Sequence, residues 1–243
     1  MSSNPLLNLK TLENVETLDS KEMTINGTVN KLFVLTGIVV LTAMYSWSLM
    51  ASGYADKANM LMIGSSIAGL ILALITVFKP NTSHITAPAY AICEGLLVGA
   101  VSRAYASFMD GIVVNAIGIT ILVLLSMLFL YKTRIIVMTE RLRSVIMIST
   151  FAVFIFYLAG FIGALFGHPM TIFNGGALGI GVSLLICVIA AFNFIVDFDF
   201  IEKASEAKAP KYYEWYGAFG ILVTLVWLYF EVLRLLAQLA NRD

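Results

Sequence analysis

Long apolar stretches separated by short polar breaks organise this chain of 243 residues. A helix that crosses the hydrocarbon of a bilayer needs about 20 predominantly apolar residues. Seven stretches are long enough, at 31–52, 58–78, 85–107, 111–131, 144–167, 171–199 and 213–237. The breaks between them carry charges or turn residues, which end helices. The pattern therefore predicts an all-α integral membrane protein with seven transmembrane helices.

The chain before the first apolar stretch has a different character. It is polar and of mixed charge, and it lacks the basic start and early apolar run of a cleavable signal peptide. We therefore expect two regions, a polar cytoplasmic tail over residues 1–29 and a seven-helix transmembrane domain over residues 30–240.

Composition supports a membrane protein and excludes several functions. Hydrophobic residues make up 60% of the chain and charged residues 12%, whereas a soluble domain carries about 25% charged residues. The net charge is +0, so we expect no nucleic acid partner. The motifs of presenilin-type and rhomboid proteases are missing, and we therefore expect no enzyme. Calcium apart, we expect no cofactor.

Lysine and arginine are distributed unequally between the two sides of the predicted bundle. Eleven fall on the side of the N-terminus and four on the other. Cytoplasmic loops carry the excess of such residues. We therefore expect a cytoplasmic N-terminus and an external C-terminus.

Acids inside the apolar stretches are the candidate functional residues, because an ionised carboxylate in hydrocarbon is costly. Asp197 and Asp199 lie near the cytoplasmic end of the sixth stretch, and Glu94 lies roughly 9 Å past Pro88 in the third, on the same half. We expect these three to form an inner carboxylate layer. Asp197 and Asp199 are about 200° apart on a helix, so both cannot face one partner unless the helix frays.

Glu231 belongs to a different level of the bundle. It lies roughly 28 Å along the seventh helix, toward the outer face. Arg234 follows three residues later on the same helical stripe, so the two are expected to form an ion pair. Arg103, late in the third helix, is the alternative partner.

Clustered carboxylates in a low dielectric suit two tasks. They bind Ca²⁺ through oxygen ligands, or they share a proton because like charges resist joint ionisation. A site that did both would respond to pH. Asp197, Asp199, Glu94 and Glu231 are therefore the candidate ion- or proton-sensing residues, with Asp197 and Asp199 as calcium ligands. The alternative is that these acids only cap helices or form structural ion pairs.

Several motifs resemble the Bax inhibitor-1/YccA family, in its bacterial branch with an extended N-terminal tail. They are Val196-Asp-Phe-Asp-Phe-Ile-Glu202, Leu228-Tyr-Phe-Glu-Val-Leu-Arg-Leu-Leu236, Ala209-Pro-Lys-Tyr-Tyr-Glu-Trp-Tyr-Gly-Ala-Phe-Gly220 and Ala91-Ile-Cys-Glu-Gly-Leu96. The resemblance implies six helices around a central seventh, in the bacterial cytoplasmic membrane. It also implies a pH-sensitive calcium leak that an aspartate pair controls, with one aspartate on helix six and one on helix seven.

The motifs can be matched in more than one way. Helix six offers Asp197 and Asp199. On helix seven, matching Leu228-Tyr-Phe-Glu231 selects Glu231, whereas matching Val232-Leu-Arg-Leu-Leu236 selects Thr224, and the depth of Glu231 favours Thr224. We expect a pH-sensitive leak channel for cations, calcium first among them. The alternative, which the resemblance also suggests, is a non-conducting regulator that binds another membrane protein, in quality control or in the cell-death machinery.

Overall fold

The computed structural model describes residues 22–167 and 176–240. Seven long helices occupy most of this part of the chain, and all seven are long and apolar enough to cross a membrane. They are α2 (Ile25–Ala51), α3 (Ala55–Phe78), α4 (Ser83–Ala106), α5 (Ile112–Lys132), α6 (Glu140–Leu165), α7 (Gly176–Glu206) and α8 (Tyr213–Ala240). A short 3-10 turn, Pro80–Thr82, precedes α4. The prediction of a seven-helix, all-α membrane protein is confirmed.

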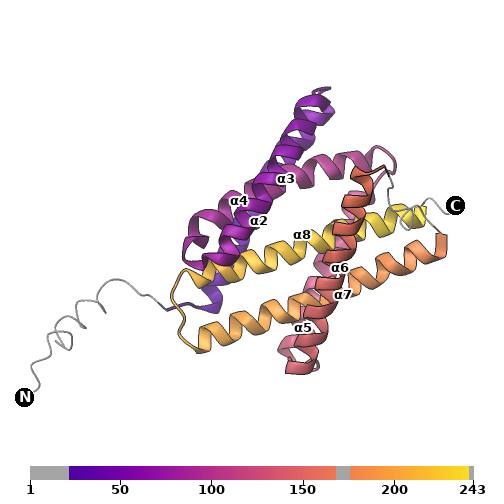
Figure 1. Ribbon diagram of the computed structural model, residues 1–243. Helices are drawn as coiled ribbons and strands as arrows, with labels where there is room; N and C mark the ends of the chain where they lie inside the picture. The colour runs from indigo at the N-terminus through magenta and orange to yellow at the C-terminus, as the bar shows by residue number, and fades with distance from the viewer. Residues whose placement is uncertain (1–21, 168–175, 241–243) are drawn as a thin grey trace, which may run out of the picture.

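The C-terminal helix α8 is the centre of the bundle. It is the most buried of the seven helices, and α6 is the least buried. Helices α2, α4, α5 and α7 pack directly against α8, while α3 packs on α4 and α6 on α7. Figure 1 shows α7 and α8 side by side, with α5 and α6 crossing them steeply. This arrangement agrees with the expectation of six helices around a central seventh.

Two apolar clusters meet on α8. One joins it to α5 and α7 and includes Ile112, Phe194 and Leu228. The other joins it to α2 and α4 and includes Leu35 and Leu222. Because α8 contributes to both clusters, it holds the two halves of the bundle together.

Helices α7 and α2 extend furthest beyond the predicted stretches. Helix α7 continues to Glu206 instead of ending at 199, so the acids near its end lie within one continuous helix. Helix α2 begins at Ile25 instead of 31, because the hydroxyl of Thr24 accepts a hydrogen bond from the amide of Gly27 and caps the helix. Most of the predicted tail lies outside the described residues, and so do residues 168–175, which include the start of the sixth stretch at 171.

The ends of the helices define two faces of the bundle. The linker between α7 and α8 lies at one, which we call the linker end. There the amide of Met23 donates to the carbonyl of Ala209 (2.8 Å), and the hydroxyl of Ser83 donates to the carbonyl of Tyr212 (2.8 Å). We call the opposite face, where α8 ends, the C-terminal end.

Glycines allow α4 to approach α2 closely. A Cβ atom on Gly95 would lie 1.8 Å from the Thr42 hydroxyl, and one on Gly99 would lie 2.1 Å from the carbonyl oxygen of Ala43. Small residues at such spacing let helix backbones come together in lipid. The contact explains why this stripe of α4 is made of small residues.

We expect Gly99→Ala to lower the melting temperature of the purified protein, because the added methyl group meets backbone atoms of α2 that cannot move aside. Overpacking of this kind costs about 1–3 kcal/mol. Gly118→Ala on α5 is the matched control, since a Cβ atom there meets nothing within 4 Å. It should melt no lower than the parent, because alanine favours helix over glycine. Equal melting temperatures for the two variants would contradict the close contact.

Candidate functional site

Asp197 faces the central helix. The residue is half-buried, and its Oδ2 accepts a hydrogen bond from the Thr224 hydroxyl of α8 (2.7 Å). Gly220, one turn earlier on α8, leaves room for the carboxylate, because a Cβ atom there would lie 3.2 Å from Oδ1. Among the described residues, none of the ion pairs involves Asp197. The carboxylate therefore has a hydroxyl partner and no cationic one in this part of the chain.

Asp199 has the opposite surroundings. It is buried and forms ion pairs with Arg143 of α6 and with Lys203 one turn later on α7, whose Nζ lies 2.9 Å from Oδ2. Because Asp197 and Asp199 point to different sides of α7, as their spacing predicts, one faces α8 and the other faces α6. Two cations compensate the charge of Asp199.

Glu202 also has a cationic partner at the linker end. Arg134 Nη2 lies 2.6 Å from its Oε1, and the Tyr131 hydroxyl donates to its other oxygen. Both partners come from the end of α5 and the turn after it, so this pair fixes the α5–α6 connection to α7.

Glu231 lies in a buried network near the C-terminal end. It is 1% exposed. Its carboxylate accepts hydrogen bonds from the Tyr157 hydroxyl (2.6 Å) and from Trp227 Nε1 (3.2 Å), and it lies 3.1 Å from Arg234 Nη1. Arg103 lies elsewhere, with its guanidinium 5.6 Å from the centre of the Trp47 ring. Arg234, rather than Arg103, is the cation beside Glu231.

Glu94 is half-buried on α4. It lies beside Gly69 of α3, where a Cβ atom would be 3.9 Å from Oε1, and it interacts with Tyr90 one turn earlier. The Tyr90 ring packs edge-on against Phe219 of α8, with 5.0 Å between the ring centres. None of the ion pairs in the described structure includes Glu94.

The structure thus gives each predicted acid its own partners. Thr224, and not Glu231, is the α8 residue that contacts Asp197. Among the described residues, no three His, Cys, Asp or Glu side chains form a group that could hold a metal ion. Calcium binding by Asp197 and Asp199 stays a prediction.

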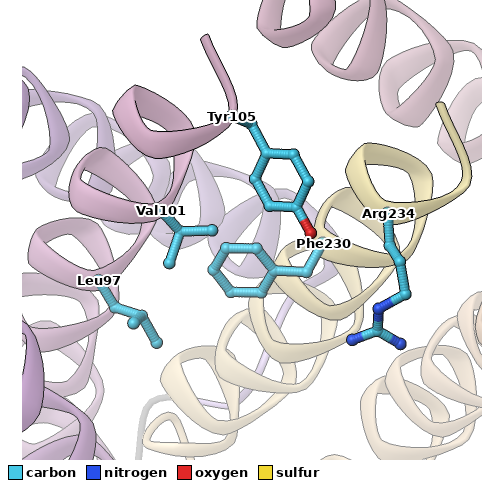
Figure 2. A pocket seen from close by; sticks show the side chains of 5 residues that line it. All are labelled: Leu97, Val101, Tyr105, Phe230 and Arg234. Atoms are coloured by element: carbon cyan, nitrogen blue, oxygen red, sulfur yellow. The ribbon is translucent and has the colours of Figure 1, made fainter. Parts of the chain in front are cut away.

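A pocket of about 190 Å³ opens between α4 and α8, away from Asp197. Figure 2 shows Leu97, Val101 and Tyr105 following one another along α4, opposite Phe230 and Arg234 of α8. The pocket is therefore apolar along most of its length, and a tyrosine and an arginine lie toward the C-terminal end.

A polar seam attaches α6 to the bundle. Three side chains at seven-residue intervals contact α7 or α8, and they are Arg143, Thr150 and Tyr157. Their partners are Asp199, Asn193 and Glu231. The two buried apolar residues of α6, Ile146 and Val153, lie between them on the same face. Because α6 buries the least surface of the seven helices, these hydrogen bonds are a large part of its attachment.

Glu214 is a buried acid that the sequence analysis missed. Its Oε1 accepts hydrogen bonds from the amide (3.1 Å) and hydroxyl (2.9 Å) of Thr24, and its Oε2 lies 2.9 Å from Lys31 Nζ. Gly27 makes room for it, because a Cβ atom there would lie 2.0 Å from Oε1. The signal in the sequence was an acid in the first turn of a helix, a favourable position for negative charge, but nothing indicated that its partners lie at the start of α2.

Comparisons with known proteins give one match. The family model described as Bax inhibitor 1 like matches residues 4–241, nearly the whole chain. No curated protein and no solved structure matches. The match agrees with the resemblance found in the motifs of the third, sixth and seventh helices.

We expect Glu214→Ala to destabilise the protein by about 2 kcal/mol, because it removes hydrogen bonds to a charged group and leaves Lys31 without this partner. The measurement is thermal unfolding in detergent. Glu22→Ala is the control, since Glu22 pairs with Lys208 (3.2 Å) while both side chains are largely exposed, and exposed pairs contribute about 0–1 kcal/mol. A loss no greater than that of the control would contradict a fastening role for Glu214.

Proposed function

We propose that this chain, which belongs to the Bax inhibitor 1 like family, is a pH-sensitive pathway through which cations leak across the membrane. The observation that carries the proposal is the surroundings of Asp197. This carboxylate lies inside a membrane bundle, and its hydrogen-bond partner is the hydroxyl group of Thr224. Asp199, Glu202, Glu214 and Glu231 each lie beside a lysine or an arginine.

The difference between these acids matters because of the low dielectric. An acid that is paired with a cation can stay ionised without a mobile ion. An acid without such a partner is stabilised in hydrocarbon by a proton or by a mobile cation. Asp197 is therefore the group at which we expect ions or protons from solution to act.

pH dependence follows from competition at one carboxylate. A proton and a cation use the same oxygen atoms of Asp197, so each excludes the other. Protonation also changes the contact with Thr224, because a protonated carboxyl can donate as well as accept. A change in pH is thus expected to alter both the occupancy of the site and the contact between α7 and α8. Glu94, which has Tyr90 beside it, is a second position of this kind.

Calcium is the ion that the family resemblance implies, so it is measured first, with potassium alongside. The second candidate function is a non-conducting regulator that binds another membrane protein. This function is supported by one face of α6, where the exposed aromatic side chains of Phe151, Phe154 and Phe161 could contact another membrane protein. Flux measurements distinguish the two functions.

The decisive test is ion flux into vesicles that contain the purified protein, at mildly acidic and mildly alkaline pH. We expect flux above that of empty vesicles, with a rate that differs between the two pH values. Asp197→Asn should remove this difference, because asparagine cannot take up the proton. Asp110→Asn, in the exposed connection after α4, should behave like the parent.

The direction of the pH effect identifies how Asp197 acts. Flux that falls on acidification indicates that the ionised carboxylate binds the passing cation. Flux that rises indicates that the Asp197–Thr224 contact closes the pathway. No flux of either cation at either pH would exclude a leak and leave the regulator as the function.

We also propose that the linker end faces the cytoplasm of a bacterial cell, because the excess of lysine and arginine lies on that side. In a variant without Cys93 and Cys187, a single cysteine at Asp110→Cys should react with a membrane-impermeant maleimide in intact cells. A single cysteine at Glu140→Cys, which is exposed at the linker end, should react only after the membrane is opened. The reverse pattern would invert the topology.

A further inference from the structure

The Asp197 site carries a single negative charge. Among the described residues, the oxygen atoms available to a cation at this site are the two carboxylate oxygens of Asp197 and the hydroxyl oxygen of Thr224. The hydroxyl is uncharged. The nearest acid along the chain, Asp199, points away toward Arg143 and Lys203. In the described part of the bundle, Asp197 is not part of any group of three or more His, Cys, Asp or Glu side chains that could hold a metal ion.

A site with one negative charge in a low dielectric is neutralised by one positive charge. A proton or an alkali metal ion leaves the occupied site neutral. A divalent ion leaves it with one uncompensated positive charge, which is unfavourable inside a bilayer. Calcium sites in proteins also use several carboxylate groups among their oxygen ligands, whereas this site has one carboxylate and a neutral hydroxyl.

The charges around Asp199 also favour a monovalent over a divalent cation at Asp197. Asp199 pairs with two cations, Arg143 and Lys203, so this group carries an excess of one positive charge. It lies two residues from Asp197 on the same helix. Because Coulomb energy is proportional to the charge of the ion, this excess repels a divalent cation twice as strongly as a monovalent one.

We propose that the Asp197–Thr224 site admits singly charged cations, a proton or an alkali metal ion, and discriminates against calcium, with Thr224 as the residue that sets this preference. The inference rests on the proposed leak function and names its class of ion, which differs from the calcium that the family resemblance implies. It predicts that a second carboxylate at position 224 would change the preferred valence.

The test compares potassium and calcium fluxes into vesicles for the parent and for two variants at residue 224. The parent should pass potassium faster than calcium. Thr224→Asp adds a carboxylate opposite Asp197 and should raise the calcium-to-potassium flux ratio by at least about tenfold, which corresponds to about 1.4 kcal/mol. Thr224→Asn is the control, because asparagine matches aspartate in size but carries no charge, and its flux ratio should stay well below that of Thr224→Asp.

Two results would overturn the proposal. One is a parent protein that passes calcium as fast as potassium or faster, when Asp197→Asn reduces both fluxes. The other is a folded Thr224→Asp variant whose flux ratio equals that of Thr224→Asn. If Thr224→Asp does not fold, the comparison of potassium and calcium in the parent decides the question.

A binding measurement separates this proposal from the leak itself. A cation that binds the folded state raises its melting temperature. At matched ionic strength in detergent, potassium or sodium should stabilise the parent more than Asp197→Asn, and calcium should add nothing further. Calcium stabilisation that depends on Asp197 would overturn the valence assignment even in a protein that passes no ions, whereas absent flux alone would overturn only the leak.

Discussion

The cost of an unpaired charge in hydrocarbon governs how this bundle is assembled. Lipid offers no water to solvate an ionised acid, so each acid inside the bundle needs a partner from the protein or from solution. Glu214, Asp199 and Glu202 find cations on other helices or at their ends. These pairs connect α8 with α2, α7 with α6, and α7 with the end of α5. Compensation of charge therefore also fixes the relative positions of helices.

The helices are held together in two different ways. Apolar side chains give little preference for protein over lipid, so association in a membrane depends on close packing and on hydrogen bonds between helices. Helices α2 and α4 use close packing, with Gly95 and Gly99 against the backbone of α2. Helix α6, the least buried, relies on polar contacts, including that between Thr150 and Asn193 of α7. The first contact depends on shape, and the second depends on keeping polar groups paired.

The sequence predicts the parts of this structure that depend on length, hydropathy and depth. The seven spans follow from apolar length, and the separation of Glu231 from Asp197 follows from the rise per residue along α8. The pairing of Asp199 with Arg143 could not be predicted, because it depends on how α6 and α7 rotate toward each other. A similar limit explains the predicted end of α7 at 199. The charges beyond it indicated the end of the span, whereas Glu202 and Lys203 form ion pairs and the helix continues to Glu206.

Asp197 and Asp199 show how one helix can carry two acids side by side in different surroundings. Asp199 faces α6 and is held by two cations, so its charge is part of the attachment between helices. Asp197, two residues earlier, faces α8, where Gly220 and Thr224 offer space and a hydroxyl. Under the proposed function, a proton or a cation would therefore bind and leave at Asp197 while the ion pairs that hold α6 and α7 together stay intact. The pitch of the helix, which points the two acids to different sides, is what keeps these roles apart.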